Sequence, residues 1–276
     1  MYRPPYFYGG MPVLLPPPVV VGVEVRPVWA NNLSFELGIM QQVAFDALYV
    51  AVNVHYPGVI HRAGQDQASI TAEQRYAAVK ANVDELKPLQ VGLAVYNARG
   101  QLVSWEINLS DFDAATDGHT ARSLSYIAGR GLVVEDLRRH GVPAAALTHA
   151  LAYCGLVARP GLTWITYSGA YHVAYLLKVI TGGAPLPPNI FAFLATVRHL
   201  LAAHIFDVAR MATDFYRGPV GLDDVASLLG IPPPLRSPLL AGAASVRALD
   251  SFMVLRHLFG GDVSTYMGLL QGLQVT

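Results

Sequence analysis

Cysteine is almost absent from this chain, which has a single one, Cys154, among 276 residues. A lone thiol cannot close an internal disulfide, so the sequence does not resemble the small secreted domains that depend on disulfides. Cys154 lies in an apolar stretch, and we expect it to be a buried thiol. We therefore expect the protein to reside in a reducing compartment.

Charge is also scarce. Asp, Glu, Lys and Arg make up 14% of the residues, apolar types make up 53%, and 19 basic residues balance 19 acidic ones. A net charge of +0 provides no basic excess for the phosphates of a nucleic acid, so we expect RNA binding to be weak or absent. The high apolar fraction indicates that part of the surface meets a protein partner.

Long uninterrupted apolar runs are missing as well. The run at residues 11–23 is broken by Pro12 and by three consecutive prolines at 16–18, which a membrane helix or a signal peptide would poorly tolerate. We therefore expect a soluble intracellular protein, cytoplasmic, nuclear or both. Residues 1–27 are rich in Pro, Tyr and Gly without periodicity, which predicts a flexible arm before one domain at residues 28–276.

Hydrophobic periodicity in that domain predicts both strands and helices. Residues 48–54 form an apolar run of strand length, and Thr71 with Gln74 forms a capping box before a helix that ends near Pro88. Residues 89–96 and 101–109 read as strands joined by a tight turn. One more strand is expected at 162–167, and helices at 34–46, 144–156, 170–181, 188–202, 208–216, 221–229 and 241–259. Because no repeat or linker is visible, we predict a single α/β domain, a mixed central sheet surrounded by helices.

Three segments carry a resemblance to a known family. Residues 48–60, LYVAVNVHYPGVI, resemble the first motif of the Pop/Caf-type deadenylases, the nuclease subunit of the Ccr-Not complex, where an apolar strand ends Met-Asp-Thr-Glu-Phe-Pro-Gly-Val. Residues 164–178, WITYSGAYHVAYLLK, resemble its His-Ser-Gly-Tyr-Asp-Phe-Gly-Tyr-Leu stretch, and residues 241–245, AGAAS, resemble its Ala-Gly-Ser-Asp-Ser. The similarity covers about residues 28–270 and implies the ribonuclease H-like fold of the RNase D-like exonucleases.

The resemblance also implies which positions should carry catalysis. Active members hold two divalent ions with four carboxylates, two of which lie at positions i and i+2 of one strand and so share a face. Those two positions are Asn53 and His55 here, the others are His172 and Ala244, and the general-base histidine corresponds to Leu239. All four negative charges are replaced by neutral groups. The remaining acidic residues of that region are expected at helix ends or on the surface, namely Asp207, Asp223, Asp224 and Asp250.

The resemblance therefore implies a pseudo-enzyme of the poly(A)-specific 3′–5′ exoribonuclease family. It would lack the Mg or Mn cofactor of active members, because a lone amide and two imidazoles are poor ligands for so hard a cation. Its role would be protein–protein interaction, with the Ccr-Not scaffold subunit and the leucine-rich-repeat nuclease subunit as partners. Oligomeric state is not indicated.

Two other interpretations stay open. His55 and His172 are candidate ligands of an altered metal site, since imidazole suits Zn²⁺, and such a site would leave a residual exoribonuclease. Tyr56, Tyr167 and Tyr171 are candidates for stacking on bases in a poly(A)- or RNA-binding module that does not cleave. The more ordinary roles are hydrogen-bonded cleft fillers for the histidines and core packing for the tyrosines.

Overall fold

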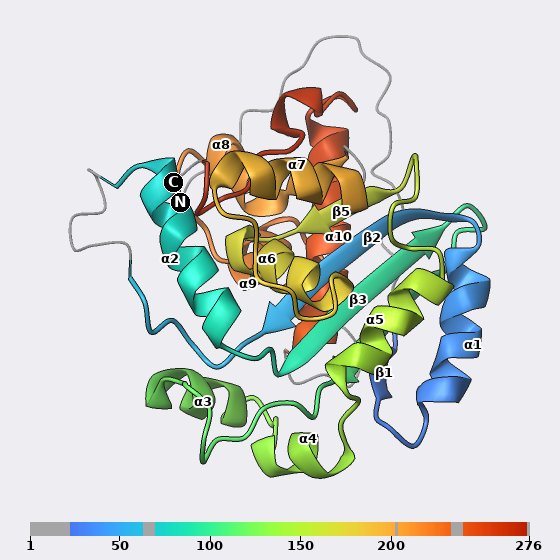
Figure 1. The fold of residues 1–276 in the computed structure, drawn as a ribbon. Coiled ribbons are helices and arrows are strands. Elements are labelled where there is room, and N and C mark those ends of the chain that lie inside the picture. Colours follow the sequence, from blue (N-terminus) through green and yellow to red (C-terminus); the bar gives the residue numbers. More distant parts are fainter. Residues whose placement is uncertain (1–22, 63–69, 202–203, 233–239, 275–276) are drawn as a thin grey trace, which may run out of the picture.

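The computed structural model describes residues 23–62, 70–201, 204–232 and 240–274. A mixed sheet of six strands has the order β1-β4-β3-β2-β5-β6 (Figure 1). Strand β3 is antiparallel to both of its neighbours, β2 and β4, whereas β1, β5 and β6 join as parallel strands. The strands are β1 (Val25–Val28), β2 (Ala47–His55), β3 (Gln90–Asn97), β4 (Leu102–Asn108), β5 (Thr163–Thr166) and β6 (Ile205–Asp207).

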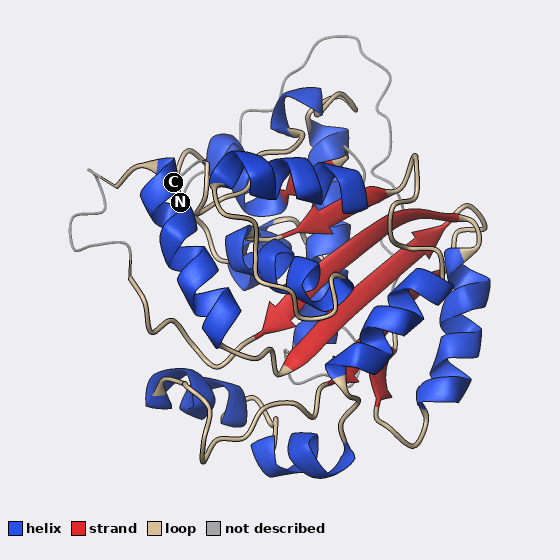
Figure 2. Cartoon of the chain, in the orientation of Figure 1, coloured by secondary structure: helices blue, strands red, loops and turns tan. Residues whose placement is uncertain are grey.

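Helices cover both faces of the sheet, which confirms the predicted α/β class (Figure 2). Helix α10 crosses one face and contacts β2, β3, β4 and β5, while α6 packs on the other face against β2, α2 and α5. The helices are α1 (Leu33–Ala44), α2 (Ala72–Glu85), α3 (Ala121–Ala128), α4 (Val134–His140), α5 (Ala144–Tyr153), α6 (Ala170–Ile180), α7 (Ile190–Leu200), α8 (Val208–Tyr216), α9 (Leu222–Leu228) and α10 (Ala241–Leu258).

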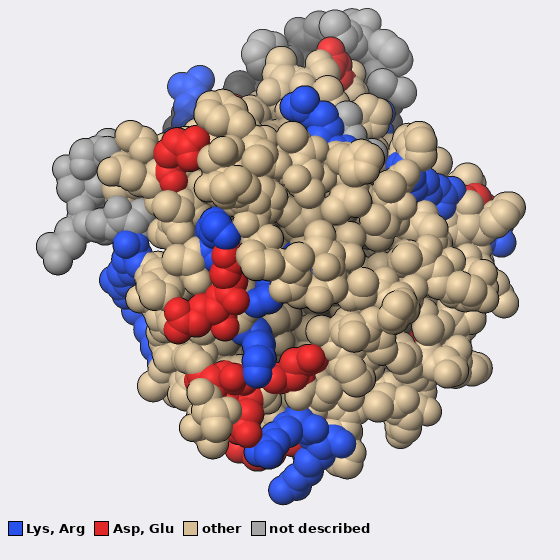
Figure 3. Space-filling view, viewed as in Figure 1, with Lys and Arg blue, Asp and Glu red and all other residues tan. Residues whose placement is uncertain are grey.

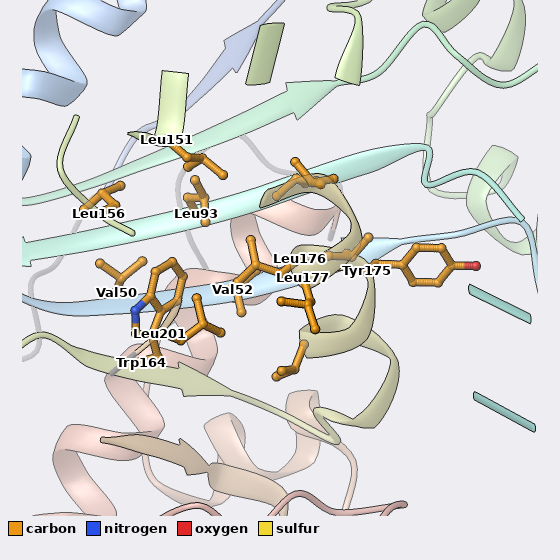
Figure 4. Packing of buried hydrophobic residues seen from close by; sticks show 14 of the residues in the cluster. Val50, Val52, Leu93, Leu151, Leu156, Trp164, Tyr175, Leu176, Leu177 and Leu201 are labelled. Carbon is orange, nitrogen blue, oxygen red and sulfur yellow. The ribbon is translucent and has the colours of Figure 1, made fainter. Parts of the chain in front are cut away.

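The alternation of β2 divides the core into two layers. Val50 and Val52 are fully buried in the cluster that contains α5 and α6, as Figure 4 shows. Ala51, between them, belongs to the cluster on the α10 side. Because side chains two apart share a face, Asn53 and His55 follow Ala51 toward α10. The strand thus presents valines to one layer and its two polar residues to the other.

Small residues allow α10 to approach the sheet closely. Gly92 of β3 lies directly under the start of α10, and a β-carbon there would fall 1.9 Å from the carbonyl oxygen of Ala241. A β-carbon on Gly242 would likewise fall 2.5 Å from Cγ1 of Val25. Since atoms cannot overlap to this extent, the glycines fix how near the first turn of α10 lies to the strands.

Most predicted elements are confirmed with boundaries displaced by a few residues. The capping box of α2 is present, with Thr71 Oγ1 accepting from the Gln74 N–H and Gln74 Oε1 accepting from the Thr71 N–H. Cys154 is a buried free thiol, as expected. No helix within the described ranges combines the length and apolar character that a bilayer crossing requires.

The expected arm needs a correction at its end. Most of residues 1–27 lies outside the described residues, but residues 25–27 belong to β1, which pairs in parallel with β4 from Val25 opposite Ser104 onward. The folded domain therefore begins before residue 28. A four-residue run that contains Pro27 carries too little periodicity to indicate a strand, and the pairing with β4 makes it one.

Candidate functional site

A cleft of about 820 Å³ lies at the carboxyl end of β2. Its lining includes Asn53 and His55 from β2, His172 from the first turn of α6 and Ala244 from the first turn of α10. Four positions that are far apart in the sequence thus meet at one end of the sheet. This confirms that they share a cleft. Leu239, the position of the family's general base, lies outside the described residues.

Hydrogen bonds tie His172 to the end of β2. The Val54 N–H donates to His172 Nδ1 at 3.0 Å, and His172 Nε2 lies 3.3 Å from the Asn53 amide. Because Nδ1 accepts, the proton of the neutral ring is on Nε2. The atom of Asn53 that faces Nε2 is the donor Nδ2, so the contact becomes a hydrogen bond when the side-chain amide is turned to present its oxygen. Burial lowers the pKa of His172 to about 4. The ring is therefore neutral at pH 7 and fixed in place.

His55 is neutral for similar reasons. Burial is the main cause that lowers its pKa to about 4, and the nearby His172 and Arg130 lower it further. Its Nδ1 atom is buried and has no hydrogen-bond partner within the described part of the chain. Protonating either histidine would bury an uncompensated charge, so both resist becoming imidazolium.

These residues do not fit the metal pair of a four-carboxylate nuclease. Two imidazoles, one amide and the methyl group of Ala244 offer no carboxylate to Mg²⁺ or Mn²⁺. Two imidazoles also fall short of the three or four protein ligands that a zinc site needs. Across the described ranges, no three or more His, Cys, Asp or Glu side chains are grouped so that they could hold a metal ion.

Two carboxylates do line the cleft. Asp223 and Asp224 lie in the first turn of α9, which confirms their prediction as helix-end residues. The Asp223 carboxylate is 2.5 Å from Arg247 and 3.8 Å from Arg130, so its charge is compensated by arginine. The expectation was wrong for Asp250, which lies in the interior of α10 and is buried. Hydrophobic periodicity assigns a charged residue to the exposed face of a helix, so it could not show that this aspartate is buried.

Asp207 stabilises the turn that precedes α6, the helix that carries His172 at the cleft. Its buried carboxylate accepts hydrogen bonds from the backbone N–H groups of Ser168, Gly169, Ala209 and Gln271, at 2.7–3.0 Å. Burial raises its pKa to about 6 although all four hydrogen bonds oppose that rise. Ser168 has a positive φ of 54°. Four donors from three separate segments thus hold the Asp207 carboxylate, and two of them, from Ser168 and Gly169, tie it to the strained turn. His172 follows Ser168 by one turn of helix.

The comparisons with known proteins agree with this geometry. Residues 28–143 match the profile of the CAF1 family ribonuclease. The chain is 26% identical over 265 residues to probable CCR4-associated factor 1 homolog 7 of Arabidopsis thaliana, covering 92% of this chain and 94% of that protein. Its structure resembles S. pombe Pop2p in the Mg²⁺- and Mn²⁺-bound form, with a TM-score of 0.80 and 26% identity over 90% of this chain and 99% of that one. These findings support membership of the Caf1/Pop2 deadenylase family.

A second structural neighbour was crystallized together with a protein partner. A chain in the structure of the yeast NOT1 MIF4G domain co-crystallized with CAF1 aligns with a TM-score of 0.75 and 26% identity, over 94% of this chain and 100% of that one. The RNase domain of the yeast Pop2 protein aligns with a TM-score of 0.76 and 25% identity, over 95% and 98% of the two chains. Together these neighbours confirm the predicted ribonuclease H-like fold for one α/β domain.

The tyrosines considered for base stacking are packed inside this Caf1/Pop2 fold. Tyr56 stacks on Tyr171 and Tyr175, with ring centroids 5.1 and 5.0 Å apart. Tyr167 is buried, and its hydroxyl donates to the carbonyl oxygen of Val220. Tyr56 and Tyr167 do line the cleft, whereas Tyr171 does not. Their rings are engaged with neighbours, so the packing interpretation accounts for them.

Residues of α3 and of the turn that follows it line the cleft, and sequence patterns did not indicate them. Arg122, Tyr126 and Arg130 follow one another at spacings of four, and the guanidinium of Arg130 lies 4.5 Å from the centre of the Tyr126 ring. Gly58, with φ 126°, allows α3 to sit here, because a β-carbon on it would fall 2.3 Å from Thr120 Oγ1. The i, i+4 spacing was the signal available, although it could not show that this helix faces the cleft.

Proposed function

We propose that this protein is a catalytically inactive member of the deadenylase family that acts through protein–protein interaction in the Ccr-Not system. One observation carries the proposal. Asn53, His55, His172 and Ala244 converge on one cleft, and none of them has a carboxylate. On this proposal the family's cleft persists without the groups that would hold a metal pair.

The chemistry of the cleft supports a pseudo-enzyme without a metal cofactor. In two-metal hydrolysis, carboxylates hold the ions that activate water and stabilise the leaving oxygen. Here the pKa values of His55 and His172 are both lowered to about 4, so near pH 7 the rings are neutral. His172 is also hydrogen-bonded to the Val54 N–H through Nδ1. A neutral cleft floor attracts divalent cations far less than one bearing four negative charges.

The direct test is poly(A) trimming. We expect the purified full-length chain not to shorten a 5′-labelled poly(A) oligonucleotide in Mg²⁺ or Mn²⁺, over times in which an active deadenylase consumes it. Samples without metal control for contaminating nucleases. Trimming that requires metal and disappears in the His55→Ala or His172→Ala variant would overturn the proposal.

The partners are proposed from the family and from the surface. Relatives are named as factors associated with CCR4, and one structural neighbour was crystallized with a NOT1 MIF4G domain. We infer docking to the Not1 scaffold subunit and to the leucine-rich-repeat nuclease subunit, and we propose that the protein acts in the cytoplasm, the nucleus or both. Figure 3 shows few charged side chains over α5, compared with the lower left of the same view. Exposed apolar side chains include Tyr153, the last residue of α5, at 66% exposure, and Phe45, directly after α1, at 82%.

Docking can be tested by pull-down with the cognate Not1 MIF4G domain. We expect the wild-type chain to be retained and the double variant Phe45→Glu, Tyr153→Glu to be retained less, because carboxylates disfavour a dry apolar contact. The matched control is Leu228→Glu, since Leu228 is 62% exposed but belongs to α9, in the layer of α10. Lack of retention of the folded wild type would refute docking to the scaffold while leaving the trimming result unaffected.

A further inference from the structure

A second pocket lies outside the cleft, where the end of β1 meets α4. Its volume is about 540 Å³, and it shares no lining residue with the cleft. This Trp29 pocket is lined by Trp29, Ala30 and Asn31 on one side and by Asp136, Arg139 and His140 of α4 on the other. The Ala30 N–H donates to the His140 carbonyl oxygen at 2.9 Å, and the Trp29 N–H donates to Asn32 Oδ1 at 2.8 Å. Hydrogen bonds therefore hold both sides in place.

Trp29 gives this pocket an anchored aromatic ring. Its side chain is half-buried, packs against the buried cluster that includes Leu89 and Leu137, and also lines the pocket. Grooves lined by aromatic rings are the sites at which proteins bind polyproline II segments. Such a segment is already extended and has no internal hydrogen bonds to break, so little order is lost when it binds. The Trp29 pocket therefore suits a proline-rich ligand.

Two charged side chains of the pocket are unpaired. Neither Asp136 nor Arg139 forms an ion pair with another described residue, although they lie one turn apart on α4. Neighbouring Arg138, which does not line the pocket, is paired with Asp113 at 2.9 Å. A ligand can therefore offer a cationic group to Asp136 and an aromatic ring to the Arg139 guanidinium.

The sequence that precedes β1 has all of these features. Residues 2–8 read YRPPYFY, so two consecutive prolines directly follow an arginine and are flanked by tyrosines. Arg3 is the only charged residue before Glu24. Consecutive prolines favour polyproline II, because each ring fixes φ at about −65°. The segment thus complements the pocket in proline content, in charge and in aromatic rings.

We propose that residues 2–8 of this chain dock in the Trp29 pocket as a polyproline II segment. The two prolines pack against the Trp29 ring, and Arg3 pairs with Asp136. Arg139 lies over a neighbouring tyrosine ring of the segment. The docked segment closes the pocket to proline-rich segments of other proteins, which bind only after displacing it.

The connecting chain is long enough for this contact. Val23 is buried in the core cluster on the α10 side, and six residue steps separate it from Trp29, which is about 20 Å of extended strand. Eighteen residue steps separate Pro5 from Val23 and span up to about 56 Å in polyproline II geometry. A tethered segment has an effective concentration on the order of 1 mM, so a Kd of about 0.1 mM for the free segment keeps it bound about 90% of the time.

Acrylamide quenching of tryptophan fluorescence in the full chain tests the docking. Of the three tryptophans, Trp105 and Trp164 are fully buried, so quenching by acrylamide reports on Trp29. We expect the double variant Pro4→Gly, Pro5→Gly to raise the quenching constant of the accessible fraction at least twofold, because the segment no longer shields the ring. The matched control replaces the prolines at 16 and 17 by glycine, the same change outside the docking segment, and should quench like the wild type.

A charge exchange tests the contact between Arg3 and Asp136. Arg3→Glu and Asp136→Arg should each raise the quenching constant at least twofold, and the two together should restore the wild-type value, because the ion pair forms again with its signs reversed. Glu135→Arg is the control, since Glu135 lies in the first turn of α4 but does not line the pocket. Disturbed folding would not be repaired by a second substitution of this kind.

The outcomes separate the possible occupants of the pocket. Protection that is independent of protein concentration, is lost in the Pro4→Gly, Pro5→Gly variant and returns with the charge exchange supports docking within one chain. Protection that falls on dilution, together with a dimer in sedimentation, assigns the pocket to a second copy and overturns the proposal. A wild type that quenches like the Pro4→Gly, Pro5→Gly variant also overturns it, and protection by an added peptide of residues 1–9 would then identify a pocket for segments of other chains. Circular dichroism verifies that each variant is folded.

Discussion

Asp250 creates a dependence of stability on pH that one substitution should remove. It lies in the interior of α10 with 7% of its surface exposed, and no hydrogen bond or ion pair joins it to other described residues. Burial raises its pKa to about 7 from an ordinary value of 3.8. We therefore expect Asp250→Asn to stabilise the protein at pH 8 much more than at pH 4.5.

The sign and size follow from proton linkage. In the unfolded chain the Asp250 carboxyl ionises near pH 3.8, whereas in the folded chain it stays protonated up to about pH 7. Between these values the folded state binds more protons, so raising the pH destabilises the wild type. Each unit of pKa difference is worth about 1.4 kcal/mol, so the stabilisation by Asn should grow by about 3 kcal/mol between pH 4.5 and pH 8. Any pH-independent difference between Asn and protonated Asp cancels in this comparison.

Urea unfolding of both proteins at pH 4.5 and pH 8 measures the difference directly. Asp262→Asn is the control, because the Asp262 carboxylate is exposed and its pKa is lowered by a hydrogen bond from the Ser264 N–H. That variant should show no gain at pH 8. If Asp250→Asn changes the free energy of unfolding equally at both pH values, the carboxylate is not buried in the way described.

Three further predictions concern the cleft and the core. Gly58→Ala should destabilise the fold by roughly 1–3 kcal/mol more than Gly183→Ala, because both have positive φ but only the new β-carbon at 58 would meet Thr120; equal melting temperatures would contradict this. Cys154 should resist a thiol reagent at pH 8 until urea is added, since burial raises its pKa to about 11; rapid labelling of the native protein would show an accessible thiol. A variant with the family's four carboxylates should bind Mn²⁺ more tightly by calorimetry than the wild type, with only weak catalysis, and a folded variant that binds no better would refute the correspondence; its changes are Asn53→Asp, His55→Glu, His172→Asp and Ala244→Asp.

The sequence predicted the body of the fold because its signals there were local. Residues 48–54 and 89–96 are apolar and bounded by turns, and Thr71 with Gln74 carries the start of α2 in its own side chains. Strand β6, Ile205–Asp207, was missed because three residues show no periodicity. Only pairing with β5 defines it.

Only those cleft residues that lie in the family motifs could be predicted from the sequence. Asn53 and His55 could be placed on one face by strand alternation, and resemblance joined them to His172 and Ala244. The role of α3 could not be foreseen. It depends on the close approach of Gly58 to Thr120, between segments 62 residues apart in sequence, and no spacing in either segment encodes such a contact.

The carboxylate of Asp207 makes the cleft depend on a segment that is distant in the sequence. One of its four donors is the N–H of Gln271, and the flanking Leu270 and Leu273 are fully buried in the core cluster around β2. Without this segment, the Asp207 carboxylate would lack one donor and the core around β2 would lose two buried leucines. The turn at Ser168 that carries His172 therefore depends on residues about a hundred positions later in the sequence, and a substitution or deletion near residue 270 should disturb the cleft.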